Sequence, residues 1–156
     1  MGVKETEDIV NDTISIEDLK QFEAIYKSAE AKGMLSHTEM FEYAYCLVRS
    51  SYEDDVKKGL RLFKELIDDN YDGSREILYY LAVGNFKLKN YRKALEFTKL
   101  SLNAEPNNTQ VRDLHTLIEA KLRKDAFVGA AAVGSVAFGV VGAAVVGAAY
   151  LLTKKK

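Results

Sequence analysis

Apolar residues recur every three or four positions from Ser15 to Lys124, and no segment keeps the alternation of apolar and polar residues that is typical of a half-buried strand. This spacing predicts an all-α fold. Short polar segments interrupt the pattern and divide it into expected helices at 15–31, 36–50, 54–69, 74–88, 91–104 and 108–125. The sequence therefore predicts a six-helix bundle, and the last helix is expected to continue into the apolar C-terminal segment.

The predicted boundaries coincide with residues that favour helix ends. Ser15 and Ser36 each stand three residues before an acid, in "SIED" and "SHTE", which is the spacing of a capping box. Residues that end helices follow at Gly33, in "DDNYDG" up to Gly73, and at Asn90. These signals support the division into six helices.

Two segments 35 residues apart share the pattern of a tetratricopeptide repeat. In the second segment the pattern residues are Leu78, Leu81, Ala82, Ala94 and Pro106. In the first segment they are Tyr43, Cys46, Leu47, Gly59 and Phe63. The sequence thus predicts a domain at 15–125 with two tetratricopeptide-like helix pairs. Because two repeats alone bury too little surface, the first and last helices are expected to cap them.

The first helix of each pair, "MFEYAYCLV" and "ILYYLAVGNF", is apolar nearly all round, which is typical of a helix buried on every side. In a tetratricopeptide pair, one face of this helix lines a concave groove. The predicted groove residues are Phe41, Ala44, Val48 and Ser51 in the first repeat, and Glu76, Tyr79, Val83 and Phe86 in the second. An apolar, tyrosine-bearing groove favours a peptide-binding site. The alternative is that a neighbouring element of the same chain covers it permanently.

Residues 1–14 form a mostly polar N-terminal arm with no long helical period. We expect this arm to lie over the groove, with Ile9, Val10 and Ile14 as small apolar anchors and its acids in water. It would then compete with a partner peptide at a high effective concentration. The alternatives are a disordered arm, or an arm that supplies part of the partner's binding surface.

The 27 residues from Ala126 to Leu152 carry no charge. As a helix they would measure about 40 Å, against about 30 Å of bilayer hydrocarbon. The sequence predicts a single-span tail anchor at 126–152, inserted after translation, with a basic tail at 153–156. Moderate hydrophobicity between basic flanks favours targeting to the mitochondrial outer membrane. The basic flanks are Lys121, Arg123, Lys124, Lys154, Lys155 and Lys156.

Small residues recur at every fourth position of this predicted span. They are Ala131, Ser135, Gly139, Ala143 and Gly147. Because small residues at this spacing let two membrane helices approach closely, the tail is a candidate for self-association. The alternative is that they only lower the hydrophobicity of the segment.

Charge and composition disfavour a nucleic-acid partner and an enzymatic function. The chain has 22 basic and 23 acidic residues, and without the three terminal lysines 19 basic residues remain, so the rest is acidic. Cys46 is the only cysteine, which excludes an intramolecular disulfide and a cysteine metal cluster. The loop beginning at Asp68 resembles half of a calcium loop, but Tyr79 stands where a glutamate is required. We predict no catalytic residue, cofactor or metal, and we expect His37 and His115 to be structural or solvated.

The segments "FEYAYCLVRS", "ILYYLAVGNFKLKNYRKAL", "EPNN" and "KDAFVGAAAVG" closely resemble the mitochondrial fission 1 protein family, from about Ser15 to the end of the chain. The resemblance implies a six-helix bundle with two tetratricopeptide-like pairs and a C-terminal transmembrane helix. It implies location in the mitochondrial outer membrane and on peroxisomes, with the helical domain facing the cytosol. It also implies an adaptor that recruits a dynamin-related GTPase, directly or through other adaptors, and binds regulators of small GTPases.

Two other classes of protein stay open at this point. One is a tail-anchored tetratricopeptide receptor for chaperones or protein import, which would carry Lys and Arg in its groove to hold a carboxylate. The predicted groove residues include neither. The other is a membrane-bound enzyme, which lacks support because the sequence has no phosphate loop, no nucleophile elbow and no HExxH motif.

Overall fold

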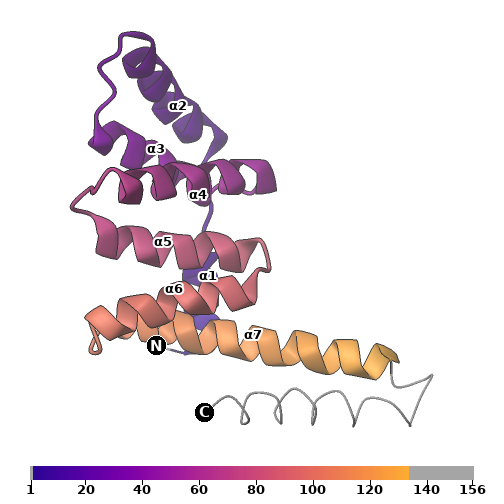
Figure 1. The fold of residues 1–156 in the computed structure, drawn as a ribbon. Coiled ribbons are helices and arrows are strands. Elements are labelled where there is room, and N and C mark those ends of the chain that lie inside the picture. Colours follow the sequence, from indigo (N-terminus) through magenta and orange to yellow (C-terminus); the bar gives the residue numbers. More distant parts are fainter. Residues whose placement is uncertain (1, 134–156) are drawn as a thin grey trace. The chain divides into compact units, whose positions relative to one another are not determined.

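The computed structural model of the chain describes residues 2–133 (Figure 1), and this part is helical with short connections, as the apolar spacing predicts. Its helices are α1 (Val3–Val10), α2 (Ile16–Ala31), α3 (His37–Val48), α4 (Glu53–Asp68), α5 (Ser74–Lys87), α6 (Tyr91–Ala104) and α7 (Thr109–Val133). From α2 to α6 each helix begins and ends within two residues of its predicted bounds.

The prediction of six helices is wrong by one, because residues 2–133 contain a seventh. The additional helix, α1, lies in the arm. Val3, Thr6 and Val10 fall at spacings of three and four, so they share one face of this short helix. A polar segment of eight residues gives too weak a periodic signal to be recognised without its packing partner.

The predicted N-terminal caps are present. The Ser15 hydroxyl accepts a hydrogen bond from the Asp18 backbone N–H at 3.0 Å. At Ser36 the capping box is complete, because its hydroxyl accepts from the Glu39 N–H at 3.2 Å while the Glu39 carboxylate accepts from the Ser36 N–H at 2.9 Å.

Three helices end at a residue with a left-handed backbone. Gly33 follows α2 with φ of 64°, as the sequence predicts. After α4 this conformation is adopted by Asn70 rather than Gly73, and after α5 by Lys89 rather than Asn90. At each of these ends the chain forms the paired backbone hydrogen bonds of a Schellman motif.

Up to Lys121 the helices form a compact unit in which α2 to α7 stack in chain order (Figure 1). Helices α3 and α4 pack as one pair and α5 and α6 as the next, and α4 joins the pairs by packing against α5. Fully buried side chains from both pairs and from α7 form the core: Tyr43, Leu47, Phe63, Leu66, Ile77, Leu81, Leu114, Leu117 and Ile118.

Lys87, at the end of α5, connects the two pairs through backbone acceptors. Its ammonium group donates to the carbonyl oxygens of Val48 at 3.0 Å and Ser50 at 2.9 Å. Val48 is the last residue of α3, where helix carbonyls have no partner within the helix, and Ser50 follows two residues after it. Burial lowers the pKa of Lys87, so this cation is held in place at some desolvation cost.

Within residues 2–133, no helix is both long enough and apolar enough to cross a membrane. The predicted span at 126–152 begins inside α7, which continues as a helix to Val133. The rest of that span, with Ser135, Gly139, Ala143 and Gly147, lies outside the described residues. The same holds for Lys154, Lys155 and Lys156.

Candidate peptide-binding groove

Two adjoining cavities on the stacked pairs share Tyr79, Tyr80 and Gln110 and together form one surface, which we call the groove. The open cavity, of about 380 Å³, is lined by Arg75, Glu76, Tyr79, Tyr80, Glu105, Asn108, Gln110 and Val111. The arm-side cavity, of about 160 Å³, is lined by Ile9, Val10, Asp12, Tyr45, Arg49, Tyr79, Tyr80, Val83 and Gln110.

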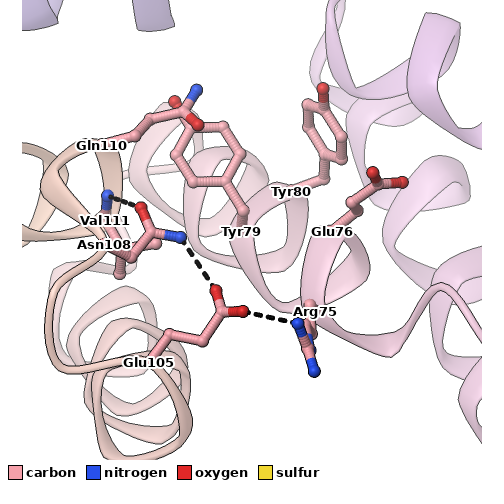
Figure 2. A pocket seen from close by; sticks show the side chains of 8 residues that line it. All are labelled: Arg75, Glu76, Tyr79, Tyr80, Glu105, Asn108, Gln110 and Val111. Atoms are coloured by element: carbon pink, nitrogen blue, oxygen red, sulfur yellow. Dashed lines mark hydrogen bonds and ion pairs between the residues drawn. The ribbon is translucent and has the colours of Figure 1, made fainter.

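A continuous set of hydrogen bonds forms one side of the open cavity (Figure 2). The Arg75 guanidinium donates to Glu105 at 2.7 Å, and the Asn108 amide donates to the other oxygen of that carboxylate at 3.1 Å. Asn108 also accepts from the Val111 backbone N–H at 3.1 Å, which caps α7. The network therefore fixes the turn before α7 against the start of α5.

Tyr79 and Tyr80 present neutral hydroxyl groups to the groove. Burial raises the pKa of Tyr79, although a hydrogen bond from Gln110 opposes this effect. Burial raises the pKa of Tyr80 to about 12. Both hydroxyls therefore keep their protons at physiological pH and can donate or accept a hydrogen bond to a bound peptide.

Aromatic rings from the first repeat hold Tyr80 in position. The Tyr80 ring stacks on Phe63 of α4, with centroids 5.8 Å apart and planes at 10°. Tyr45 of α3 meets it edge-on at 5.0 Å, and Phe41 of the same helix lies 5.4 Å from Phe63. The groove is thus built on an aromatic layer that crosses from one repeat to the other.

The predicted groove residues divide into two groups. Glu76, Tyr79 and Val83 line the groove, and Phe41 is half-buried in the aromatic layer beneath it. The other predicted positions, Ala44, Val48, Ser51 and Phe86, line neither cavity, and Ser51 is exposed in the connection after α3.

Ala44, Val48 and Phe86 are buried within their own repeats, so their assignment to the groove is wrong. Ala44 and Val48 lie against Gly59 of α4. The Phe86 ring packs on Tyr91, at the start of α6, with centroids 5.6 Å apart. These positions fill the space between the two helices of a pair.

Sequence reasoning missed Tyr45, Arg49, Tyr80 and Gln110, which line the groove. Tyr45 and Arg49 each stand one position after a residue wrongly placed there, and one position rotates a helical side chain by about 100°. Phe41, Tyr45 and Arg49 are spaced by four, so a single helical face running through them was a signal that could have identified the correct surface.

The arm lies in this groove, with Val10 as its buried anchor. Val10 is 4% exposed and Thr6 is 5% exposed. Ile14 is half-buried, whereas Ile9 lies at the edge of the arm-side cavity and is 51% exposed, so it is not the buried anchor that the sequence predicts. Because α1 is helical, Ile9 projects about 100° away from the face that carries Val10.

Polar contacts hold the arm at its middle and at its C-terminal end. Glu7 pairs with Lys121 of α7 at 2.5 Å, and Asp12 pairs with Arg49 at the end of α3. The Ile14 backbone N–H donates to the Arg49 carbonyl oxygen at 3.1 Å. Lys121, predicted as part of the targeting flank, therefore contacts the arm.

The groove contains arginines, contrary to the prediction that it has no Lys or Arg. Arg49 lines the arm-side cavity and Arg75 the open cavity, and each pairs with a carboxylate of this chain. Burial alone would lower the pKa of Arg49, but its hydrogen bonds to Asp12 and Tyr45 outweigh burial and raise it. This site therefore combines apolar surface with fixed positive charge.

The remaining candidate residues have structural surroundings. Cys46 is buried, and burial raises the pKa of its thiol to about 11, which leaves little reactive thiolate. His37 lies 3.4 Å from Asp69, and His115 Nδ1 lies 2.7 Å from the Thr98 hydroxyl. Residues 2–133 hold no cluster of three or more side chains suited to a metal ion.

Comparison with known proteins matches two family profiles to the stacked pairs. The Fis1 N-terminal tetratricopeptide repeat matches residues 40–70, and the Fis1 C-terminal tetratricopeptide repeat matches residues 75–127. Over 126 residues the chain is 45% identical to mitochondrial fission 1 protein of Bos taurus and 44% identical to that of Homo sapiens. Each alignment covers 80% of this chain and 83% of the relative.

A similar fold occurs in the crystal structure of yeast Fis1 in complex with an Mdv1 fragment that contains the N-terminal extension and coiled-coil domains of Mdv1. The two chains superpose with a TM-score of 0.68 at 25% identity, over 75% of this chain and 91% of the yeast chain. The tetratricopeptide-like arrangement predicted from the sequence is therefore shared with solved relatives.

Proposed function

Because the chain belongs to the mitochondrial fission 1 protein family, we propose that it is a mitochondrial fission adaptor whose groove binds a segment of a partner protein. The observation that carries this proposal is the burial of Val10 in the groove. It supports a surface able to accept a short helix with one small aliphatic anchor. No catalytic role is part of this proposal.

The partner we propose is a dynamin-related GTPase, recruited directly or through an adaptor, with regulators of small GTPases as further partners. The yeast relative bound to an Mdv1 fragment supports binding of a protein segment as the mode of action. Since the arm occupies part of the groove, a partner that binds there must displace it. The arm would then weaken binding by about its own docking free energy.

We propose further that residues 126–152 anchor the protein in the mitochondrial outer membrane, with the helical domain in the cytosol, and that peroxisomes carry it as well. The uncharged segment between basic flanks supports an anchor. The small residues at every fourth position support self-association of the span.

The test of this function uses full-length chain in cells that lack their own family member, together with binding of a purified dynamin-related GTPase and of an Mdv1-type adaptor. Tyr79→Ala and Val83→Glu alter the groove, whereas Leu100→Glu places the same charge at an exposed site on α6. Wild type and Leu100→Glu should restore mitochondrial division and bind a partner, and the groove variants should do neither. Full activity in both groove variants would place the partner site elsewhere.

Deletion of residues 1–14 measures the competition by the arm. We expect roughly tenfold tighter partner binding, since a few small apolar contacts contribute about 1–2 kcal/mol. Weaker binding would instead assign part of the partner's binding surface to the arm.

A further inference from the structure

Two cations flank the apolar part of the groove that the arm occupies. Lys121 of α7 pairs with Glu7, and Arg49 at the end of α3 pairs with Asp12. Val10 lies between these acids in the sequence and is buried against the groove. The occupied groove therefore contacts an acid three residues before a buried aliphatic residue and another acid two residues after it.

The two cations are more enclosed than those of an ordinary surface pair. The Lys121 and Glu7 side chains are 27% and 32% exposed, and the Arg49 side chain is 29% exposed, although its partner Asp12 is 64% exposed. By comparison, Lys57 and Asp54 on the outer face of α4 are 50% and 96% exposed. Partial burial reduces screening by water and salt, so the charge of an occupant matters more here than on the open surface.

The Arg49 guanidinium is also preorganised to bind a carboxylate. Its guanidinium donates to the Tyr45 hydroxyl at 3.0 Å and lies 5.2 Å from the centre of the Tyr45 ring. Tyr45 is itself packed edge-on against Tyr80. Because Tyr45 lies outside the arm, release of the arm removes neither contact, and less side-chain entropy should be lost when a carboxylate binds.

Exchange of the arm for a partner therefore has an electrostatic requirement. A segment that filled only the place of Val10 would cover Arg49 and Lys121 while leaving both without a carboxylate. An enclosed charge that loses its partner is costly, whereas an incoming acid restores the pair. We propose that the groove selects acidic helical partner segments with the pattern acid-x-x-aliphatic-x-acid, which the arm reproduces as Glu7, Val10 and Asp12. This inference rests on the proposed function for the existence of a partner and adds the chemistry of its binding segment.

The test uses full-length chain with Val10→Asp, which puts a carboxylate into the apolar site and releases the arm. The probe is a displayed library of the arm peptide, residues 2–15, in which positions 7 and 12 are randomised and Val10 is kept. We expect selection of Asp or Glu at both positions. A synthetic peptide with Glu7→Gln and Asp12→Asn should bind roughly tenfold more weakly than the unchanged peptide.

A charge-reversed chain serves as the matched control. It carries Arg49→Glu and Lys121→Glu in addition to Val10→Asp, and its circular dichroism melt is compared with that of Val10→Asp alone. On this chain the selected residues should change from acidic to basic. Absence of acid selection on the first chain, or the same acids selected on both chains, would overturn the proposed pattern.

Partner binding to the full-length protein gives a second readout, in which two sets of substitutions that both release the arm should change the affinity in opposite directions. Val10→Asp should tighten binding of the purified partner, because the arm is released and both cations remain. Arg49→Glu with Lys121→Glu also releases the arm but should abolish binding, and tighter binding there would overturn the inference while leaving the proposed function intact. A wild-type dimer in sedimentation that Val10→Asp dissociates would assign the groove to the arm of a second copy instead.

Discussion

Gly59 of α4 lies in backbone contact with Ala44 of α3: a Cβ atom added to Gly59 would stand 2.8 Å from the Ala44 carbonyl oxygen. The two helices of the first repeat can approach this closely because position 59 has no side chain. The same Cβ would also lie 3.0 Å from side-chain atoms of Leu47 and Val48.

Gly59→Ala should therefore separate α3 from α4 and lower the free energy of unfolding by about 1–3 kcal/mol, the usual cost of overpacking a core. Urea denaturation followed by circular dichroism measures it. Gly129→Ala is the matched control, because an added Cβ there meets nothing within 4 Å and alanine favours helix. Equal stability of both variants would contradict the close packing of the pair.

Leu81→Asp should remove most of the stability of the helical domain. Leu81 is 1% exposed. An aspartate in its place would either carry an unpaired charge in apolar surroundings or stay protonated, which requires a large rise in its pKa. We expect a loss of several kcal/mol, against a total that is marginal for any domain. Leu100→Asp is the control, since Leu100 is 54% exposed on α6 and should melt like wild type.

Because the Cys46 thiol is buried, we expect the free energy of unfolding to fall as the pH becomes alkaline. Its pKa is raised to about 11 by burial, against about 8.5 in an unfolded chain. The fold thus favours the protonated thiol, whose contribution is complete below about pH 8.5 and is lost as the pH rises from there toward 11.

We expect the stability difference between wild type and Cys46→Ala to fall by roughly 1–2 kcal/mol between pH 7.5 and pH 10. Comparing the two proteins at each pH cancels the ionisation of the tyrosines. Native protein should also react slowly with a maleimide and fast in urea. Rapid labelling without denaturant would show that the thiol is accessible.

Targeting is expected to reside in the C-terminal segment. A fluorescent reporter fused to residues 120–156 should coat mitochondria, because this segment carries the uncharged stretch and both basic flanks. Replacing Lys154, Lys155 and Lys156 by serine should move part of the reporter to the endoplasmic reticulum. A diffuse reporter would show that this segment is not a membrane anchor. Unchanged mitochondrial labelling in the serine variant would show that the terminal lysines do not select the membrane.

Helix boundaries and the two repeats could be predicted because they follow from local signals. Ser36, Gly33 and the apolar spacing each act within a few residues of their own position. The rotation of a helix about its axis is different, because a helix that is apolar nearly all round gives no local sign of which face meets its partner. This is why Ala44 was predicted to line the groove instead of Tyr45, while the less uniform second repeat gave Tyr79 correctly.

The short helix in the arm could not be predicted for a related reason. Its helical conformation depends on contacts made far away in sequence, by Val10 in the groove and by Glu7 with Lys121. An isolated eight-residue helix is unstable in water, so its sequence alone carries little helical signal. The predicted position of the arm over the groove was nevertheless correct for Val10.

The contact of Lys87 with the end of α3 couples the folding of the two repeats. In a chain with only the first repeat formed, the carbonyl groups of Val48 and Ser50 would lose the donor that the second repeat supplies. Such a half-folded species is raised in free energy, which adds a nearest-neighbour coupling to the apolar contact between α4 and α5. The repeats are therefore expected to unfold together in a single transition, even though each has the sequence pattern of a separate unit.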